Sequence, residues 1–255
     1  MSDASTACVL VIGNEILSGR TQDKNIQYLA LKLNERGVRL MEVRVIPDVR
    51  DTIIATLNEC RPKFTYVFTT GGIGPTHDDI TSECVAAAFG VKMYVDQRAV
   101  DAMKARRPDM DMNPARMRMA TFPVGAELIP NPVSAAPGYH IGSVFVLAGI
   151  PVVMQSMYDS LQHMLHGGAP VKSRAIRISL GEGTIAQGLS DVQARYPDVE
   201  IGSYPSARAG RLGVSLVFRS TDPARIAPAV DEVKALVRAL GDTPEDEPLD
   251  AEAAG

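Results

Sequence analysis

The fold is decided by the stretch Tyr66-Val67-Phe68-Thr69-Thr70-Gly71-Gly72-Ile73-Gly74-Pro75-Thr76-His77-Asp78-Asp79, which precedes a helical pattern from Ile80 to Phe89 closed by Gly90. A strand that runs through a glycine-rich turn into a helix presents free backbone N–H groups at a positive dipole end, which suits phosphate. Two adjacent carboxylates in such a turn would repel an anion unless a divalent cation lay between them. The stretch therefore predicts a metal-assisted phosphate site.

A simpler interpretation of the same turn is structural. Glycine turns follow strands in many α/β proteins, and an aspartate before a helix is often only its N-cap. Neither a P-loop lysine nor a full dinucleotide fingerprint accompanies the turn. Capping would explain one of the two carboxylates, that of Asp78 or of Asp79. It explains the presence of both less well.

The residues that precede this stretch are predicted to alternate between strand and helix. Residues 7–12 form a continuous apolar run, 25–36 place apolar side chains on one helical face, and 43–46 form a second apolar run. Repeated βα units predict a mostly parallel sheet with helices on both faces. Ligands of such sheets bind beyond the carboxyl ends of the strands, where residues 13–15, 47–48 and 71–79 converge.

A domain boundary is expected near residues 166–170, which read His-Gly-Gly-Ala-Pro. We therefore assign 1–168 to a three-layer α/β domain and 169–241 to a small α+β domain of βαββα order. Within the second domain, Gly202-Ser203-Tyr204-Pro205 is expected to link two strands. Residues 242–255 are acidic and rich in Ala and Pro, so they are predicted to form a disordered tail.

Composition excludes several classes of protein. The net charge of −4 offers no electrostatic case for nucleic acid. No apolar stretch is long enough to span a membrane, and the polar start does not resemble a signal peptide. Cys8, Cys60 and Cys84 are widely spaced in apolar segments, which predicts reduced core thiols. A cytoplasmic protein is expected.

The residues from Gly71 to Glu83 resemble the GGxGPTxDDxTxE signature of the molybdopterin-binding-like (MoaB/Mog) domain superfamily. Within it the chain resembles the competence/damage-inducible protein A (CinA) branch and the amino-terminal domain of animal FAD synthases. Further matching segments follow in order: residues 12–19, 23–25, 131–138 and 147–151. The last reads Leu-Ala-Gly-Ile-Pro, with Ala148 where the family usually has proline.

The resemblance implies a set of site residues. His77, Asp78 and Asp79 are expected to be catalytic, and Asp48 and Asp79 to hold a metal. The expected ligand-binding residues are Gly13, Asn14, Glu15, Asn25, Gly71, Gly72, Ile73, Gly74, Thr76, Asn113, Arg116, Ser134, Gly138 and Gly149.

Structural interpretations stay open for several of these residues. Glu15 could be a capping or salt-bridging carboxylate, Asp48 a turn residue after proline, and Asn25 a helix cap. Ser134 and Gly138 are small enough to let backbone approach a ligand closely.

Three functions follow as expectations. The first is a metal-dependent pyrophosphatase acting on an ADP-ribose-like or dinucleotide diphosphate, since members of this branch act on ADP-ribose or FAD. The second is a molybdopterin-binding or adenylyl-transferring protein of molybdenum cofactor biosynthesis, and the third a non-catalytic nucleotide-binding module. Mg²⁺ or a similar divalent ion is the expected cofactor, with K⁺ and molybdopterin as further candidates. The expected partners are a small nucleotide diphosphate or pterin ligand and a second copy of the chain in a dimer.

Overall fold

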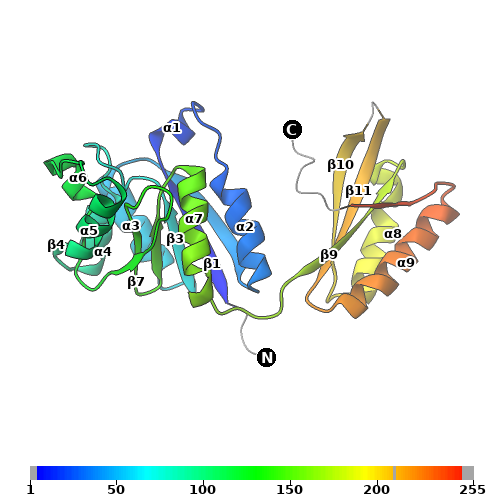
Figure 1. Cartoon of the computed structure of the whole chain (residues 1–255). Coiled ribbons are helices and arrows are strands. Elements are labelled where there is room, and N and C mark those ends of the chain that lie inside the picture. Colours follow the sequence, from blue (N-terminus) through cyan, green and yellow to red (C-terminus); the bar gives the residue numbers. More distant parts are fainter. Residues whose placement is uncertain (1–4, 209–210, 249–255) are drawn as a thin grey trace. The chain divides into compact units, whose positions relative to one another are not determined.

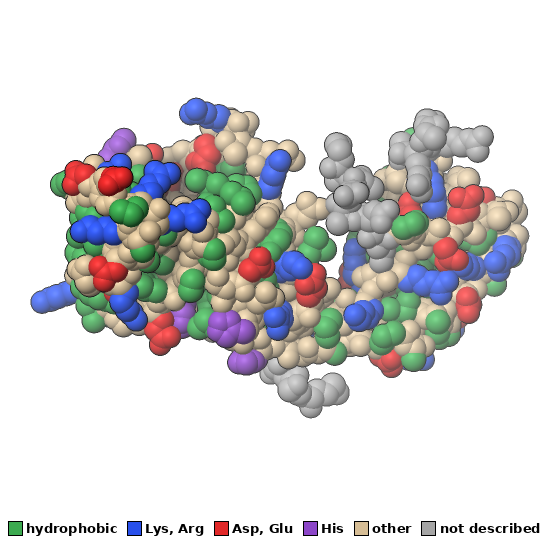
Figure 2. All heavy atoms as spheres, in the orientation of Figure 1, with side chains coloured by type: hydrophobic (Ala, Val, Ile, Leu, Met, Phe, Trp, Pro, Cys, Tyr) green, Lys and Arg blue, Asp and Glu red, His purple; other side chains and the backbone are tan. Residues whose placement is uncertain are grey.

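The computed structural model describes residues 5–208 and 211–248 and divides the chain into two compact units, Met1–Gly168 and Ala169–Gly255 (Figure 1). Among the described residues, no helix is both long and apolar enough to cross a membrane. On the face shown in Figure 2, acidic and basic side chains are interspersed over both units. This mixture agrees with the small net charge of the chain.

Unit 1 is built on a six-stranded sheet of order β2-β1-β3-β8-β7-β6. The first four strands in this order pair in parallel, and β7 and β6 add antiparallel. A separate antiparallel pair, β4-β5, lies outside this sheet. The strands are β1 (Thr6–Ile12), β2 (Arg39–Ile46), β3 (Tyr66–Thr70), β4 (Met93–Val95), β5 (Thr121–Pro123), β6 (Glu127–Ile129), β7 (Gly138–Ile141) and β8 (Val144–Leu147). The predicted, mostly parallel sheet is confirmed.

Helices cover both faces of this sheet, as expected. The helical segments of unit 1 are α1 (Asn14–Leu17), α2 (Asn25–Glu35), α3 (Arg50–Cys60), α4 (Thr81–Phe89), α5 (Gln97–Arg106), α6 (Pro114–Arg118), α7 (Pro151–Leu161) and η1 (Gln162–Met164). Strand β1 shows why two layers are needed. Cys8 and Leu10 pack with α3 and α4, whereas Val9 and Val11 pack with α2 and α7. A central parallel strand that is buried on both faces is apolar along its whole length, because neither face meets solvent.

The end of unit 1 packs against the turn between α2 and β2. The Gly168 N–H donates to the Gly37 carbonyl oxygen over 2.9 Å, and the Ser5 hydroxyl donates to the His166 carbonyl oxygen over 2.7 Å. Gly37 has a φ of 68°, and a Cβ there would overlap the Gly168 backbone. Glycine is therefore required at this close approach.

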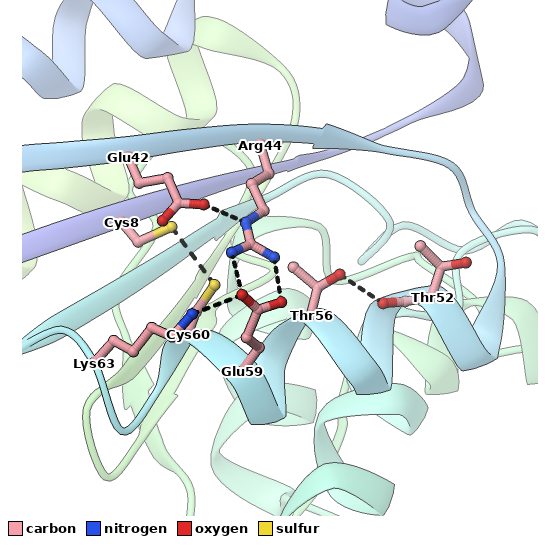
Figure 3. Close-up of polar contacts among 8 residues, drawn as sticks. All are labelled: Cys8, Glu42, Arg44, Thr52, Thr56, Glu59, Cys60 and Lys63. Atoms are coloured by element: carbon pink, nitrogen blue, oxygen red, sulfur yellow. Dashed lines mark hydrogen bonds and ion pairs between the residues drawn. The ribbon is translucent and has the colours of Figure 1, made fainter.

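The three cysteines are free and buried, which confirms the predicted core thiols. Figure 3 shows Cys8 and Cys60 facing each other beside a polar cluster on β2 and α3. Their sulfur atoms lie 3.9 Å apart. Burial raises the pKa of both thiols, and it raises that of Cys84 to about 11. Thiols held protonated in this way are poor nucleophiles, so they serve packing.

The polar cluster beside them is centred on Arg44. Its guanidinium binds both carboxylate oxygens of Glu59 at 2.7 and 2.8 Å and also contacts Glu42, and Lys63 binds Glu59 at 2.7 Å. Figure 3 shows Arg44 between the two glutamates. Hydrogen bonds from Arg44 first, and then from Lys63, lower the pKa of Glu59 from 4.5 to about 2. The cluster joins the edge strand β2 to its covering helix.

Acid should remove the contribution of Glu59 to stability. Its pKa is lower in the folded than in the unfolded chain, so the contribution is present above pH 4.5 and is lost as pH falls towards 2. We expect Glu59→Gln to melt below wild type at pH 7 and the difference in Tm to shrink between pH 5 and pH 3. The matched control is Glu35→Gln, which removes an exposed partner of Lys32. A Glu59→Gln difference that is the same at pH 3 and pH 7 would contradict the assignment.

Unit 2 is a four-stranded antiparallel sheet of order β10-β11-β9-β12, packed against two helices. Its elements are β9 (Lys172–Ile178), α8 (Glu182–Arg195), β10 (Glu200–Arg208), β11 (Arg211–Ser220), α9 (Pro223–Ala239) and β12 (Glu245–Glu247). The order through α9 is the predicted βαββα. Residues 202–205 do not link two strands as expected, because they lie inside β10 and pair with β11.

The predicted disordered tail is wrong over its first part. Residues 245–247 form β12 and pair with β9. Within that strand Asp246 binds Arg174 at 3.0 Å and Lys234 at 2.8 Å. Before the strand, the Asp242 carboxylate accepts the N–H of Ser179 over 2.6 Å. Basic partners on β9 and α9 thus stabilise an acidic strand that has little apolar surface. Residues 249–255 lie outside the described part of the chain.

Candidate functional site

The glycine-rich turn starts at the carboxyl end of β3, between the ends of β1 and β8. The Gly71 N–H donates to the Leu147 carbonyl oxygen over 3.1 Å, and a Cβ on Gly71 would overlap the Ile12 carbonyl oxygen. A Cβ on Gly149 would lie 3.2 Å from the Gly71 Cα. Three strand ends therefore meet at the turn, and the predicted residues Gly71 and Gly149 lie together.

Thr81, which follows the turn, fixes its backbone. Its hydroxyl donates to the Gly71 carbonyl oxygen over 3.0 Å, and its N–H donates to the Gly72 carbonyl oxygen over 3.0 Å. Gly72 has a φ of 68°, and a Cβ there would overlap the Thr81 hydroxyl. Thr81 is fully buried at the start of α4 and was not among the predicted site residues, although it lies inside the signature.

The turn leaves three consecutive donors free. In the described part of the chain, the N–H groups of Gly72, Ile73 and Gly74 meet no acceptor. Ile73 anchors this segment by packing its side chain against the cores on both faces of the sheet. Successive free N–H groups beside a helix N-terminus form a concave anion-binding site.

Thr76 brings the two adjacent carboxylates together. Its N–H donates to Asp79 Oδ2 over 2.8 Å, and its hydroxyl lies 2.6 Å from Asp78 Oδ1 and 2.5 Å from Asp79 Oδ2. A hydroxyl has one proton to donate, so it serves one carboxylate at a time. The hydrogen bond from Thr76, then one from the Asp78 backbone, and the nearby His77 lower the pKa of Asp78.

The capping interpretation of the aspartates is not realised. Helix α4 has Ile80 at its N-cap, and no side chain accepts a hydrogen bond from its first turn. The Asp79 carboxylate instead occupies the space beside Gly74, where a Cβ would lie 2.6 Å from Asp79 Oδ2. His77 and Asp78 are exposed, and Asp79 is half-buried. The pair is therefore available to a ligand from solvent.

A cavity of about 190 Å³ opens beside this turn. It is lined by Ile73, Gly74, Asp79, Ser82, Glu83, Met93, Arg118 and Thr121. Arg118 Nη1 donates to the Thr76 carbonyl oxygen over 3.0 Å, across 42 residues of sequence. Arg118 was not predicted, because nothing in its basic surroundings distinguishes it from a solvated helix face.

The segment after β1 is placed by Asp48. Asp48 Oδ2 accepts the N–H of Asn14 over 2.9 Å, and the Gly13 N–H donates to the Ile46 carbonyl oxygen over 3.1 Å. The Glu15 carboxylate folds back over Gly13, where a Cβ would lie 2.6 Å from either carboxylate oxygen. Asp48 thus has a structural role that leaves one carboxylate oxygen uncommitted.

Asn25 is the first residue of α2, only 3% exposed, and does not cap the helix. Its Nδ2 donates to the Gly149 carbonyl oxygen over 2.8 Å, which connects it to the turn. Its Oδ1 is buried without a partner among the described residues. The capping role belongs to Asp23, whose Oδ1 accepts the Ile26 N–H over 2.8 Å.

The remaining predicted residues have other surroundings. Asn113 caps α6 by accepting the Arg116 N–H over 3.0 Å, and Arg116 Nη1 donates to the Asp111 carbonyl oxygen over 2.6 Å. Ser134 is exposed in the loop after β6. Gly138 is buried, and a Cβ there would lie 2.7 Å from the Val146 carbonyl oxygen, so its small size serves packing on β8. That Gly138 also allows a ligand to approach stays a prediction.

Ala148 follows β8 and directly precedes Gly149. Its N–H lies 3.4 Å from Met157 Sδ, a contact that the family's usual proline could not donate. The neighbouring Gly149 still approaches Gly71 and accepts from Asn25.

Comparison with known families identifies the fold. A family described as probable molybdopterin binding domain matches residues 8–166, more than half of the chain. The chain belongs to the molybdopterin-binding domain family. Residues 170–241 match a second family, described as FAD synthase, middle domain. The two matches cover the two units separately, and the CinA-type resemblance is confirmed.

Relatives and a solved structure agree with this assignment. A protein of Metallosphaera sedula is 30% identical over 257 residues, covering 93% of this chain and 96% of the relative. A CinA-like protein of Citrifermentans bemidjiense is 36% identical over 157 residues, which span 59% of this chain and 38% of that longer protein. The crystal structure of the protein CinA from Thermoplasma acidophilum is 32% identical with a TM-score of 0.60, covering 64% of this chain and 99% of that one.

Proposed function

We propose that this molybdopterin-binding family member is a metal-dependent pyrophosphatase that hydrolyses an ADP-ribose-like or dinucleotide diphosphate. The observation that supports it best is the turn itself, in which the free N–H groups of Gly72, Ile73 and Gly74 lie close to two carboxylates. Preorganised backbone donors stabilise negative charge that develops on a phosphoryl oxygen. Adjacent carboxylates add a place for the cation that such a substrate brings.

Asp78 and Asp79 could bind a divalent cation whose remaining ligands are oxygen atoms of the substrate and of water. Among the described residues, no three His, Cys, Asp or Glu side chains come together as a ready metal site. Mg²⁺ typically uses one or two carboxylates and takes the rest from substrate phosphates and water. We propose Asp79 as its principal ligand, assisted by Asp78 and by the uncommitted oxygen of Asp48. When bound, the cation would neutralise the diphosphate and make a coordinated water more acidic.

The side chains of the turn divide the remaining roles. Because the pKa of Asp78 is lowered, its carboxylate is ionised at neutral pH and is a weak base, which suits a charge-holding role. His77 is exposed beside it and is our candidate for accepting the proton of the attacking water. Arg118 lines the adjacent cavity, where its guanidinium can offset phosphate charge.

The second candidate is binding of a pterin phosphate with transfer of adenylate. The description of the matching family, probable molybdopterin binding domain, favours it. The same N–H cradle would hold a phosphate in either reaction. The reactions differ in their product, because hydrolysis releases AMP and transfer forms an adenylated pterin from ATP.

The deciding experiment measures AMP release from ADP-ribose and FAD, with Mg²⁺ or with EDTA, and in KCl or NaCl. We expect Mg²⁺-dependent release from at least one substrate. Absence of release from both substrates would contradict the pyrophosphatase, and formation of adenylated pterin from ATP would support the second candidate. Ligand-induced stabilisation without turnover would favour a non-catalytic module. Light scattering on the same preparation tests the expected dimer.

A further inference from the structure

A second concave site in unit 1 is lined by three arginines. A cavity of about 300 Å³ lies between the end of α5, helix α6 and the loop after β6. Arg106 and Arg107 come from the end of α5, and Arg116 comes from α6. No carboxylate lines this cavity. Basic side chains are thus concentrated here, on a chain whose visible surface otherwise mixes both signs (Figure 2).

The three guanidinium groups retain most of their donors. Within the described residues, the Arg107 guanidinium has no hydrogen bond or ion pair, and the Arg106 guanidinium has one contact of 3.4 Å with the Val133 carbonyl oxygen. Arg116 donates to a backbone carbonyl and pairs with no carboxylate in the same part of the chain. Each guanidinium carries five N–H donors, and its fork matches phosphate oxygens in a bidentate arrangement.

Two carboxylates line a hollow that adjoins the arginine cavity and shares Arg107, Met110 and Arg116 with it. These are the carboxylates of Asp109 and Asp111. They form no ion pair with any of the three arginines in the described part of the chain. Positive charge in a concave site raises the local concentration of anions.

The loop opposite the arginines presents a hydroxyl. Asn131 is 5% exposed and holds the loop, since its Oδ1 accepts the Ser134 N–H over 3.2 Å and its Nδ2 donates to Ser134 Oγ over 2.6 Å. Because Ser134 Oγ accepts from Asn131, its own O–H proton is left to donate to a ligand. The next residue, Ala135, has a φ of 66°, a left-handed conformation that is unfavourable for a residue with a Cβ. A defined loop geometry is thus maintained despite a local cost.

The remaining wall of the cavity is apolar. Met103 is 3% exposed, and Met110 and Met119 are partly buried against the same core. Methionine side chains adapt to flat or irregular apolar groups. Arginines, a serine on the facing loop and a wall of methionines suit a ligand that has a phosphate and an apolar ring system.

We propose that this cavity is a second site, which binds the phosphate of a nucleoside monophosphate. Helix α6 connects it to the Asp78–Asp79 turn, because Arg118 contacts Thr76 and Arg116 lines the arginine cavity. The inference does not rest on the proposed hydrolysis, since binding here needs neither Asp79 nor a metal. A nucleoside monophosphate is also the class of product that cleavage of a dinucleotide diphosphate releases, so the site would make the enzyme sensitive to product.

The test is calorimetric titration with AMP, adenosine and inorganic phosphate in EDTA. We expect AMP to bind at least about tenfold more tightly than adenosine, and the Arg106→Ala/Arg107→Ala variant to lose at least about tenfold in AMP affinity. Lys104→Ala removes an exposed charge from the same helix without lining the cavity, so it should bind AMP like wild type. Asp79→Asn should also retain AMP binding. Arg107→Gln gives a gentler loss if the double variant is unstable.

Several outcomes would overturn the site. Wild type that binds no AMP excludes it, as does equal affinity for AMP and adenosine. Equal losses in the double arginine variant and in Lys104→Ala would show only a general effect of charge. Binding that is lost in Asp79→Asn but kept in the arginine variant would place the phosphate at the Gly72–Gly74 turn instead. Failure of the hydrolysis assay leaves these measurements unaffected, so the two proposals are judged separately.

Discussion

Replacing Asp79 with asparagine is expected to reduce Mg²⁺-dependent AMP release by at least about 100-fold, because the principal charged ligand of the proposed cation is lost. Asparagine has the same shape and retains an oxygen that can accept the Thr76 N–H, which donates to Asp79 over 2.8 Å in the native turn. The turn should therefore keep its conformation while its charge changes. The measurement is the initial rate of AMP release over a range of Mg²⁺ concentrations.

The matched control for this substitution is Asp101→Asn on α5. Asp101 is exposed, and within the described residues its carboxylate accepts a hydrogen bond from Gln97 alone, at 2.8 Å. Its change should therefore leave both rate and Mg²⁺ dependence unaltered. The Mg²⁺ dependence of the Asp79→Asn rate is a second diagnostic. Loss of a metal ligand should raise the Mg²⁺ concentration needed for half-maximal rate. Full activity in Asp79→Asn, with an unchanged Mg²⁺ requirement, would remove the turn from the mechanism.

Gly71→Ala is expected to cost about 3 kcal/mol or more in the free energy of unfolding, from backbone strain and overlap together. Gly71 has a φ of 101°, which a residue with a Cβ rarely adopts, and the new methyl group would overlap the Ile12 carbonyl oxygen. The overlapped atom belongs to the backbone of β1, which cannot rotate away from the new methyl group as a side chain would. Urea denaturation followed by circular dichroism measures the change.

The control separates strain from overlap. Gly90 also has a positive φ, of 67°, but nothing lies within 4 Å of a Cβ built there. Gly90→Ala should therefore cost only about 1 kcal/mol. Equal losses for the two variants would show that the close contact of Gly71 with β1 is unimportant. Surviving Gly71→Ala protein should also release less AMP, because the adjacent N–H groups are displaced.

Local sequence patterns were sufficient for the framework of unit 1. Apolar runs at 7–12 and 66–70 predicted β1 and β3, since a strand buried on both faces needs no polar alternation. The run at 43–46 predicted the end of the edge strand β2, in which exposed and half-buried residues alternate. The glycine turn could be predicted because its glycines, its carboxylates and the following helix are adjacent in sequence. The convergence of the strand ends then followed from the topology of parallel sheets.

Long-range contacts could not be predicted in this way. Arg118 reaches Thr76 across 42 residues, and its own segment carries no signal for that partner. The close approach of Gly138 to β8 could not be predicted either, since a glycine that approaches a neighbouring strand looks the same in sequence as one that approaches a ligand. Strand β12 was missed because its stability comes from Arg174 and Lys234, which are distant from Asp246 in the chain.

The packing of Gly168 on Gly37 has a consequence for how such proteins arise. Because the last residues of unit 1 satisfy their hydrogen bonds within unit 1, recombination after Gly168 would leave its core closed. The two family matches meet at the same place, ending at 166 and starting at 170. Glycine at position 37 thus allows the end of unit 1 to close on unit 1 itself, at the place where one family match ends and the next begins.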